Sequence, residues 1–161
     1  MIQRIQSVYL AVIAVAALLL FFLPVFSLIP GEAASDTASY SFSILSVKMT
    51  TLQGLSRDFM VLYPLIIVNS LVLMLSIAAI FMFKSRPNQI KICQALSLIV
   101  LVLIVLMAFD TAQLRTTLGP GNQLHFSVVA ILPLIQLVLC RLAGRAIKKD
   151  EQLVRSADRL R

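Results

Sequence analysis

The chain has 161 residues, of which 60% are apolar and 13% charged, with a formal net charge of +7 at pH 7. Soluble domains are about 45–50% apolar and 25% charged, so this composition excludes an ordinary soluble domain. The positive charge would suggest nucleic-acid binding in a soluble protein. Here membrane topology and attraction to anionic lipid headgroups explain it, and DNA is not an expected partner.

Four apolar stretches follow one another, at about residues 5–28, 59–83, 90–109 and 125–140. A helix needs about 20 mostly apolar residues to cross the hydrocarbon core of a bilayer. The backbone of a membrane span must satisfy its polar groups internally, and these stretches lack the alternation of barrel strands, so we expect helices. Pro64 and Pro133 are expected to kink the second and fourth of them.

The first stretch has an alternative interpretation as a secretory signal peptide. Arg4 precedes it, and small residues at 31–34 could form a cleavage site. Its apolar run is longer than the roughly 7–15 residues of a signal core, which favours an uncleaved span.

The connections between the stretches differ in length. Residues 84–88 form a tight turn, and residues 119–122, with the sequence Gly-Pro-Gly-Asn, form another. The longest connection, residues 29–58, contains the alternating run Tyr-Ser-Phe-Ser-Ile at 40–44. Such alternation predicts a short β-hairpin or small sheet that caps the bundle on its outer side.

Lys and Arg residues gather on one predicted side of the membrane. Eleven of the fourteen lie on the side of the two termini and the 84–88 turn, and the other side holds Lys48, Arg57 and Arg115. Because cytoplasmic loops carry the excess of Lys and Arg, both termini are expected in the cytoplasm.

Few residues could carry chemistry inside the membrane. Asp58, Asp110 and His125 lie at the ends of the stretches rather than in their middles, which argues against ion-coupled transport. Cys93 and Cys140 are single residues toward the expected cytoplasmic side, where they fit small apolar packing positions. No catalytic, cofactor or metal site is predicted, so we do not expect an enzyme.

Asn69 and Gln136 lie near the middle of the second and fourth stretches. An interhelical hydrogen bond is the simpler expectation for each. The alternative is that, together with Ser70, they line a polar path for a substrate or a lipid.

The last 21 residues hold seven of the fourteen Lys and Arg residues. Apolar residues recur there at helical spacing, which predicts an amphipathic helix on the inner leaflet or against a protein or RNA partner. We divide the chain into a transmembrane domain at 1–145 and a basic cytoplasmic tail at 146–161. The residues expected to contact a partner or lipid headgroups are Arg145, Lys148, Lys149, Arg155, Arg159 and Arg161.

Both ends of the chain carry a specific residue order. The start, MIQRIQSVYL, and the end, RAIKKDE at 145–151 followed by LVRSADRLR at 153–161, resemble a family of small four-helix membrane proteins from Bacteroidota. That family is described only as domain of unknown function 4293. The resemblance covers the whole chain and implies a bacterial inner-membrane protein, without implying an activity.

The expected fold is an all-α membrane protein, a four-transmembrane-helix bundle with a small extracytoplasmic β-hairpin cap and a cytoplasmic amphipathic C-terminal helix. The expected function is that of a non-enzymatic accessory or scaffold subunit of a larger inner-membrane complex. Its expected partners are other membrane protein subunits, anionic lipids and a cytoplasmic partner for the tail. The alternative is a small transporter or lipid-handling protein with a polar path at Asn69 and Gln136.

Overall fold

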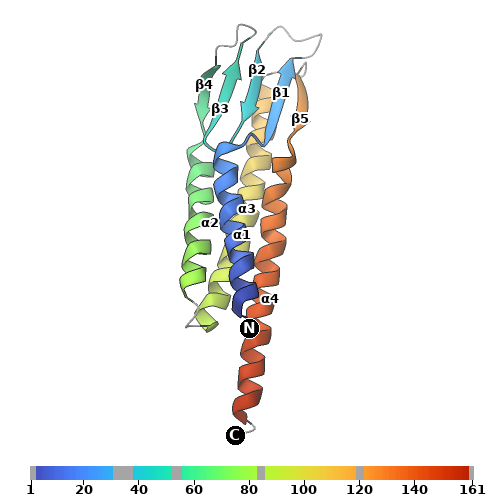
Figure 1. The fold of residues 1–161 in the computed structure, drawn as a ribbon. Coiled ribbons are helices and arrows are strands. Elements are labelled where there is room, and N and C mark those ends of the chain that lie inside the picture. Colours follow the sequence, from blue (N-terminus) through green and yellow to red (C-terminus); the bar gives the residue numbers. More distant parts are fainter. Residues whose placement is uncertain (1–2, 31–37, 52–55, 83–85, 119–121, 160–161) are drawn as a thin grey trace.

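The computed structural model describes residues 3–30, 38–51, 56–82, 86–118 and 122–159, and these form a long helical bundle with a sheet at one end (Figure 1). The helices are α1 (Gln3–Phe22), α2 (Tyr63–Phe81), α3 (Arg86–Leu118) and α4 (Leu132–Arg159), with the short 3-10 helix η1 (Val128–Ile131) before α4. The strands are β1 (Phe26–Pro30), β2 (Ser39–Phe42), β3 (Ser46–Thr50), β4 (Ser56–Val61) and β5 (Asn122–Phe126).

The four helices pack side by side, and α1 and α3 each contact both α2 and α4. The buried face of α1 shows why this chain packs as helices: Leu10, Ile13, Ala17 and Leu20 recur every three or four residues and are fully buried. All four helices contain apolar windows long enough to cross a membrane. The structure is therefore mostly helical, as expected, with four candidate membrane spans.

The antiparallel sheet has the strand order β4-β3-β2-β1-β5 and lies at the end of the bundle where α1 ends and α2 begins (Figure 1). We call this the sheet end, and the opposite end, where both chain termini lie, the tail end. Alternate residues of β1 and β2, including Phe26 and Phe42, are buried. The last turns of α3 rise beside the sheet, and Met107 and Leu114 join the same core cluster as these aromatic rings.

The sequence predicts a short β-hairpin or small sheet from residues 29–58, and the structure has a five-stranded sheet that also includes residues outside that connection. Strand β4 takes in the beginning of the second apolar stretch, and β5 takes in residues 125–126 of the fourth. Hydropathy cannot separate apolar strand residues from the start of an apolar helix, because both are equally hydrophobic. Helix α3 also continues past Phe109 to Leu118, beside the sheet, because an apolar run marks the part of a helix that can lie in a membrane and not the residue where the helix ends.

Pro64 and Pro133 are the second residues of α2 and α4. In the first turn of a helix the missing N–H has no helical partner to lose, so proline starts helices readily. The expected kinks at Pro64 and Pro133 are therefore replaced by helix starts, because hydropathy placed the beginning of both helices several residues too early.

Helix α4 runs without interruption from Leu132 to Arg159, through the expected division at 145–146. It extends past the other three helices at the tail end (Figure 1). The basic segment is therefore a continuation of the fourth apolar helix.

Candidate functional site

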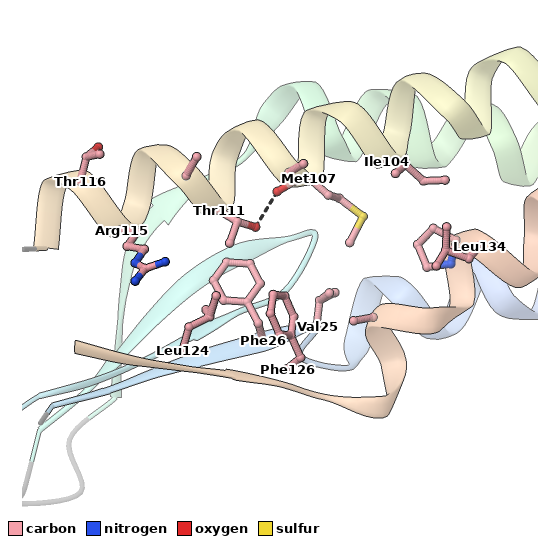
Figure 2. Close-up of a pocket in the computed structure, with 14 residues that line it drawn as sticks. Val25, Phe26, Ile104, Met107, Thr111, Arg115, Thr116, Leu124, Phe126 and Leu134 are labelled. Carbon is pink, nitrogen blue, oxygen red and sulfur yellow. Dashed lines mark hydrogen bonds between the residues drawn. The ribbon is translucent and has the colours of Figure 1, made fainter. Parts of the chain in front are cut away.

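An apolar groove of about 600 Å³ lies at the sheet end, between α3 on one side and β1, β5 and the start of α4 on the other (Figure 2). Its lining residues are Val25, Phe26, Ile104, Met107, Ala108, Thr111, Ala112, Arg115, Thr116, Leu124, Phe126, Ala130, Pro133 and Leu134. Known ligand pockets have volumes of roughly 300–1,000 Å³ and predominantly apolar walls, so this groove has the size and character of a binding site.

The wall formed by α3 is open because its residues there are small. Ala108, Thr111 and Ala112 are spaced i, i+3 and i+4, so they lie on one face of the helix. The hydroxyl of Thr111 donates a hydrogen bond to the carbonyl of Met107 at 2.6 Å. Because that hydroxyl is already paired within the helix, this part of the wall offers a ligand apolar surface and needs no hydrogen bond from it.

The floor of the groove is aromatic. Phe26, Leu124 and Phe126 project from the strands toward α3 (Figure 2). The ring of Phe26 stacks on Phe42 with centroids 4.3 Å apart, and it tilts against Phe126 at 6.4 Å. Phe26 is buried, whereas Phe126 is 68% exposed and forms the rim. One aromatic side chain is thus anchored in the core and one lies open to whatever surrounds the protein.

Among the described residues that line the groove, Arg115 is the one that carries a charge, and it extends from α3 toward the strands (Figure 2). Ile104 and Leu134 lie at the other end, toward the middle of the bundle. The guanidinium group remains charged at any physiological pH. The groove therefore combines a long apolar wall with a single positive charge at the end that lies farthest from the bundle.

Asn69 and Gln136 do not line this groove. The Nδ2 of Asn69 donates to the carbonyl of Ala17 at 2.9 Å, and the Nε2 of Gln136 donates to the carbonyl of Ile13 at 3.3 Å. Both side chains are fully buried, and their amide oxygens have no hydrogen-bond partner in the described part of the chain. The two residues contact the backbone of α1 and are engaged in helix packing.

A second hollow, of about 310 Å³, lies at the tail end between α3 and α4. Its lining residues are Ile90, Cys93, Gln94, Ser97, Cys140, Arg141, Gly144, Arg145 and Lys148. Two of the tail residues singled out from the sequence, Arg145 and Lys148, thus lie at one cleft. Lys149 is exposed outside it, and the side chains of Arg155, Arg159 and Arg161 lie outside the described part of the chain.

The family model described as "Domain of unknown function (DUF4293)" matches residues 2–160. The chain belongs to the DUF4293 family. The resemblance seen at both ends of the sequence is therefore confirmed over nearly the whole length. No curated protein matches the chain.

The remaining polar candidates of this DUF4293 protein lie apart from one another. Asp58, on β4, accepts a hydrogen bond from the hydroxyl of Ser46 at 3.2 Å, and His125, on β5, pairs opposite Ser27 of β1. Asp110 borders a separate hollow on the α2 side of the sheet, beside Met60. Over the described residues, no three His, Cys, Asp or Glu side chains come together where they could hold a metal ion.

The sequence interpretation missed the groove and counted Arg115 only as a charge. A usable signal was present: the small residues Ala108, Thr111 and Ala112 share one helical face just before that arginine. The facing residues Phe26 and Phe126 are 100 positions apart, and only the pairing of β1 with β5 brings them together.

Proposed function

We propose that this DUF4293 protein binds the acyl chain of an anionic phospholipid in the groove at its sheet end, with Arg115 at the lipid phosphate. The observation that carries the proposal is the shape and chemistry of the groove, whose wall and floor are apolar and whose far end has one fixed positive charge. An acyl chain joined to a phosphate has the matching arrangement.

The proposed orientation places the tail end in the cytoplasm of a bacterial cell and the sheet outside the inner membrane. The support is the distribution of Lys and Arg, eleven toward the tail end and three toward the sheet end. The lipid would then come from the outer leaflet of the membrane that the helices cross.

The depth of the groove supports a lipid as its occupant. If the hydrocarbon core begins near Ile90, its thickness of about 30 Å takes α3 to about residue 110 at 1.5 Å per residue. Ile104 then lies inside the hydrocarbon layer and Arg115 about 8 Å beyond it, at the depth of the phosphates. Phe126 at the rim of the groove and Val128, two residues further along the chain and 83% exposed, are apolar side chains suited to contact with lipid at that boundary.

This lipid-binding role is closer to the transporter or lipid-handling protein that the sequence offers as an alternative than to a scaffold subunit. It is located at the groove of the sheet end and not at Asn69 and Gln136. The polar path at Asn69 and Gln136 has less support, because both amide groups donate to the backbone of α1. The groove needs neither residue.

A second candidate function is that of an accessory or scaffold subunit of a larger membrane complex. It is favoured by α4, which extends past the other helices and carries exposed apolar residues, Leu142 and Leu153, beside its basic ones. Helices that present both kinds of side chain commonly bind a partner helix or a membrane surface. Neither candidate function requires catalysis.

The test is photo-crosslinking of the full-length protein in vesicles that contain phosphatidylglycerol with a diazirine in its acyl chain. Crosslinks should map to α3, β5 and the start of α4. Ala112→Phe fills the groove and should abolish most of these crosslinks. Ala95→Phe makes the same change at an exposed position of α3 outside the groove and should leave them unchanged.

Arg115→Gln should reduce crosslinking to phosphatidylglycerol about fivefold and have little effect on phosphatidylcholine, since a cation near anionic headgroups contributes about 1 kcal/mol. Arg57→Gln, an exposed arginine on β4, is the matched control. Equal crosslinking at the groove in Ala112→Phe and Ala95→Phe would refute the proposal.

A further inference from the structure

The cleft at the tail end gathers three cations on one face of α4. Arg141, Arg145 and Lys148 are spaced i, i+4 and i+7, so their side chains leave the helix in similar directions. Gln94 and Ser97 face them from α3, and no carboxylate is among the residues that line the cleft in the described part of the chain. The cleft is therefore a concentrated positive site rather than part of an ion-pair network.

The hydrogen-bonding groups of the cleft suit an oxyanion. The hydroxyl of Ser97 donates to the carbonyl of Gln94 at 2.7 Å, so its own proton is already used. The exposed side-chain amide of Gln94, the two guanidinium groups and the ammonium group supply the donors. Arginine binds phosphate oxygens through two parallel N–H groups, and lysine binds them as a compact charge.

The absence of a side chain at Gly144 opens the cleft between the two helices. A Cβ atom added there would lie 3.8 Å from the Cβ of Cys93, an ordinary contact distance. Cys93 and Cys140 are buried and close the floor with apolar surface. Alanine would therefore fit at position 144, whereas a larger side chain would have to occupy the cleft.

The surroundings of the cleft favour a lipid over a free anion. One turn nearer the middle of the bundle, on the same sides of α3 and α4, lie Leu101, which is 48% exposed, and Val138, which is 58% exposed. These side chains offer apolar surface directly beneath the cations. A headgroup in the cleft would place its acyl chains along this α3–α4 seam.

We propose that this cleft is a specific site for the headgroup of an anionic phospholipid in the cytoplasmic leaflet, and that it prefers a lipid with two phosphates. Basic pockets between transmembrane helices on the cytoplasmic side are suited to such headgroups. Three cations exceed the single negative charge of one phosphate diester, and two phosphates balance them more closely. This site is independent of the groove at the sheet end, since the two lie at opposite ends of the bundle and share no lining residue.

The test is native mass spectrometry of the full-length protein in mild detergent, titrated with tetraoleoyl cardiolipin or dioleoylphosphatidylcholine. Cardiolipin should bind at least about tenfold more tightly than phosphatidylcholine, because only its phosphates are unbalanced anions. Inorganic pyrophosphate, added as a competitor, should displace it weakly, because pyrophosphate lacks acyl chains to lie on the seam.

Lys148 and Lys149 form a matched pair, since they are adjacent, identical and both exposed, but only Lys148 lines the cleft. Lys148→Gln should weaken cardiolipin binding about fivefold or more and Lys149→Gln less than about twofold. Gly144→Leu should abolish the preference for cardiolipin with no change of charge, while Gly144→Ala should retain it. Circular dichroism melting curves establish that each variant is folded.

Three results would overturn the proposal. Equal losses in Lys148→Gln and Lys149→Gln would mean general attraction of a basic helix to anionic lipid. Unchanged binding in a folded Gly144→Leu variant would place the lipid elsewhere. Displacement by pyrophosphate at concentrations similar to those of cardiolipin would make the occupant a soluble anion.

Discussion

The amide groups of Asn69 and Gln136 provide the sharpest test of how this bundle is held together. We consider Asn69→Leu and Gln136→Leu, which replace each amide with an apolar side chain of similar size. Asn69 lies on α2 and Gln136 on α4, and each donates one hydrogen bond to the backbone of α1. The two variants therefore remove two polar contacts that join α1 to its neighbours, one on each side.

The expected cost is small for both variants. Interhelical hydrogen bonds in membrane proteins contribute about 0.6 kcal/mol on average and at most about 1.7 kcal/mol. The carbonyls of Ile13 and Ala17 lie within α1 and keep their helical partners, so neither becomes an unpaired acceptor. Each substitution also removes a buried amide oxygen that has no partner among the described residues, which offsets part of the loss.

The two hydrogen bonds differ in length, 2.9 Å for Asn69 and 3.3 Å for Gln136, so the two variants should differ in how much stability they lose. Because longer hydrogen bonds are weaker, Asn69→Leu should cost about 1 kcal/mol or less and Gln136→Leu about zero. Leu65→Ala serves as the comparison, since Leu65 is fully buried on α2 one turn before Asn69. Truncating a buried leucine to alanine costs about 2–5 kcal/mol.

The assay is unfolding of the full-length protein in mixed micelles by titration with SDS, followed by far-UV circular dichroism, which yields a free energy of unfolding. The expected order of destabilisation is Leu65→Ala, then Asn69→Leu, then Gln136→Leu. A cost for either amide variant as large as that of Leu65→Ala would refute the reasoning. It would mean that the amide oxygens bind something essential, such as a buried water or a substrate, and would restore the polar-path interpretation.

Two further predictions concern the starts of helices. Pro64→Ala should change the free energy of unfolding by less than about 1 kcal/mol in the same SDS titration, because proline in a first turn breaks no helical hydrogen bond. A loss of stability near 3 kcal/mol would instead show that Pro64 acts as a residue of the helix interior. Ser127→Ala should lower the free energy of unfolding by about 0.5–1 kcal/mol, because the Ser127 hydroxyl caps η1 by accepting a hydrogen bond from the N–H of Val129 at the long distance of 3.4 Å. Ser127→Asp should retain the cap and most of the stability. Equal losses of stability in both variants would argue against a capping role.

The tertiary structure assigned several residues a role that their position in the sequence does not indicate. In the sequence Arg115 is one of three basic residues on the expected outer side, yet in the fold it lies at the end of an apolar groove. Lys148 and Lys149 are equivalent in any charge count, but the angle of about 100° between neighbouring helical residues places only one of them at the cleft. Pro133 looked like a kink and instead starts α4 beside the groove.

The sequence by itself determined the four long apolar helices, the family and the presence of strand structure in the first long connection, because these depend on local composition and spacing. Runs of about 20 apolar residues have few alternatives to a helix that crosses or lies buried in an apolar phase. Only the tertiary structure decided the size of the sheet, the reach of α3 along it, and the groove and the cleft that α3 and α4 help to line. Those features depend on contacts between distant residues, such as Phe26 with Phe126 and Gln136 with Ile13, and local hydropathy carries no information about which distant segments meet.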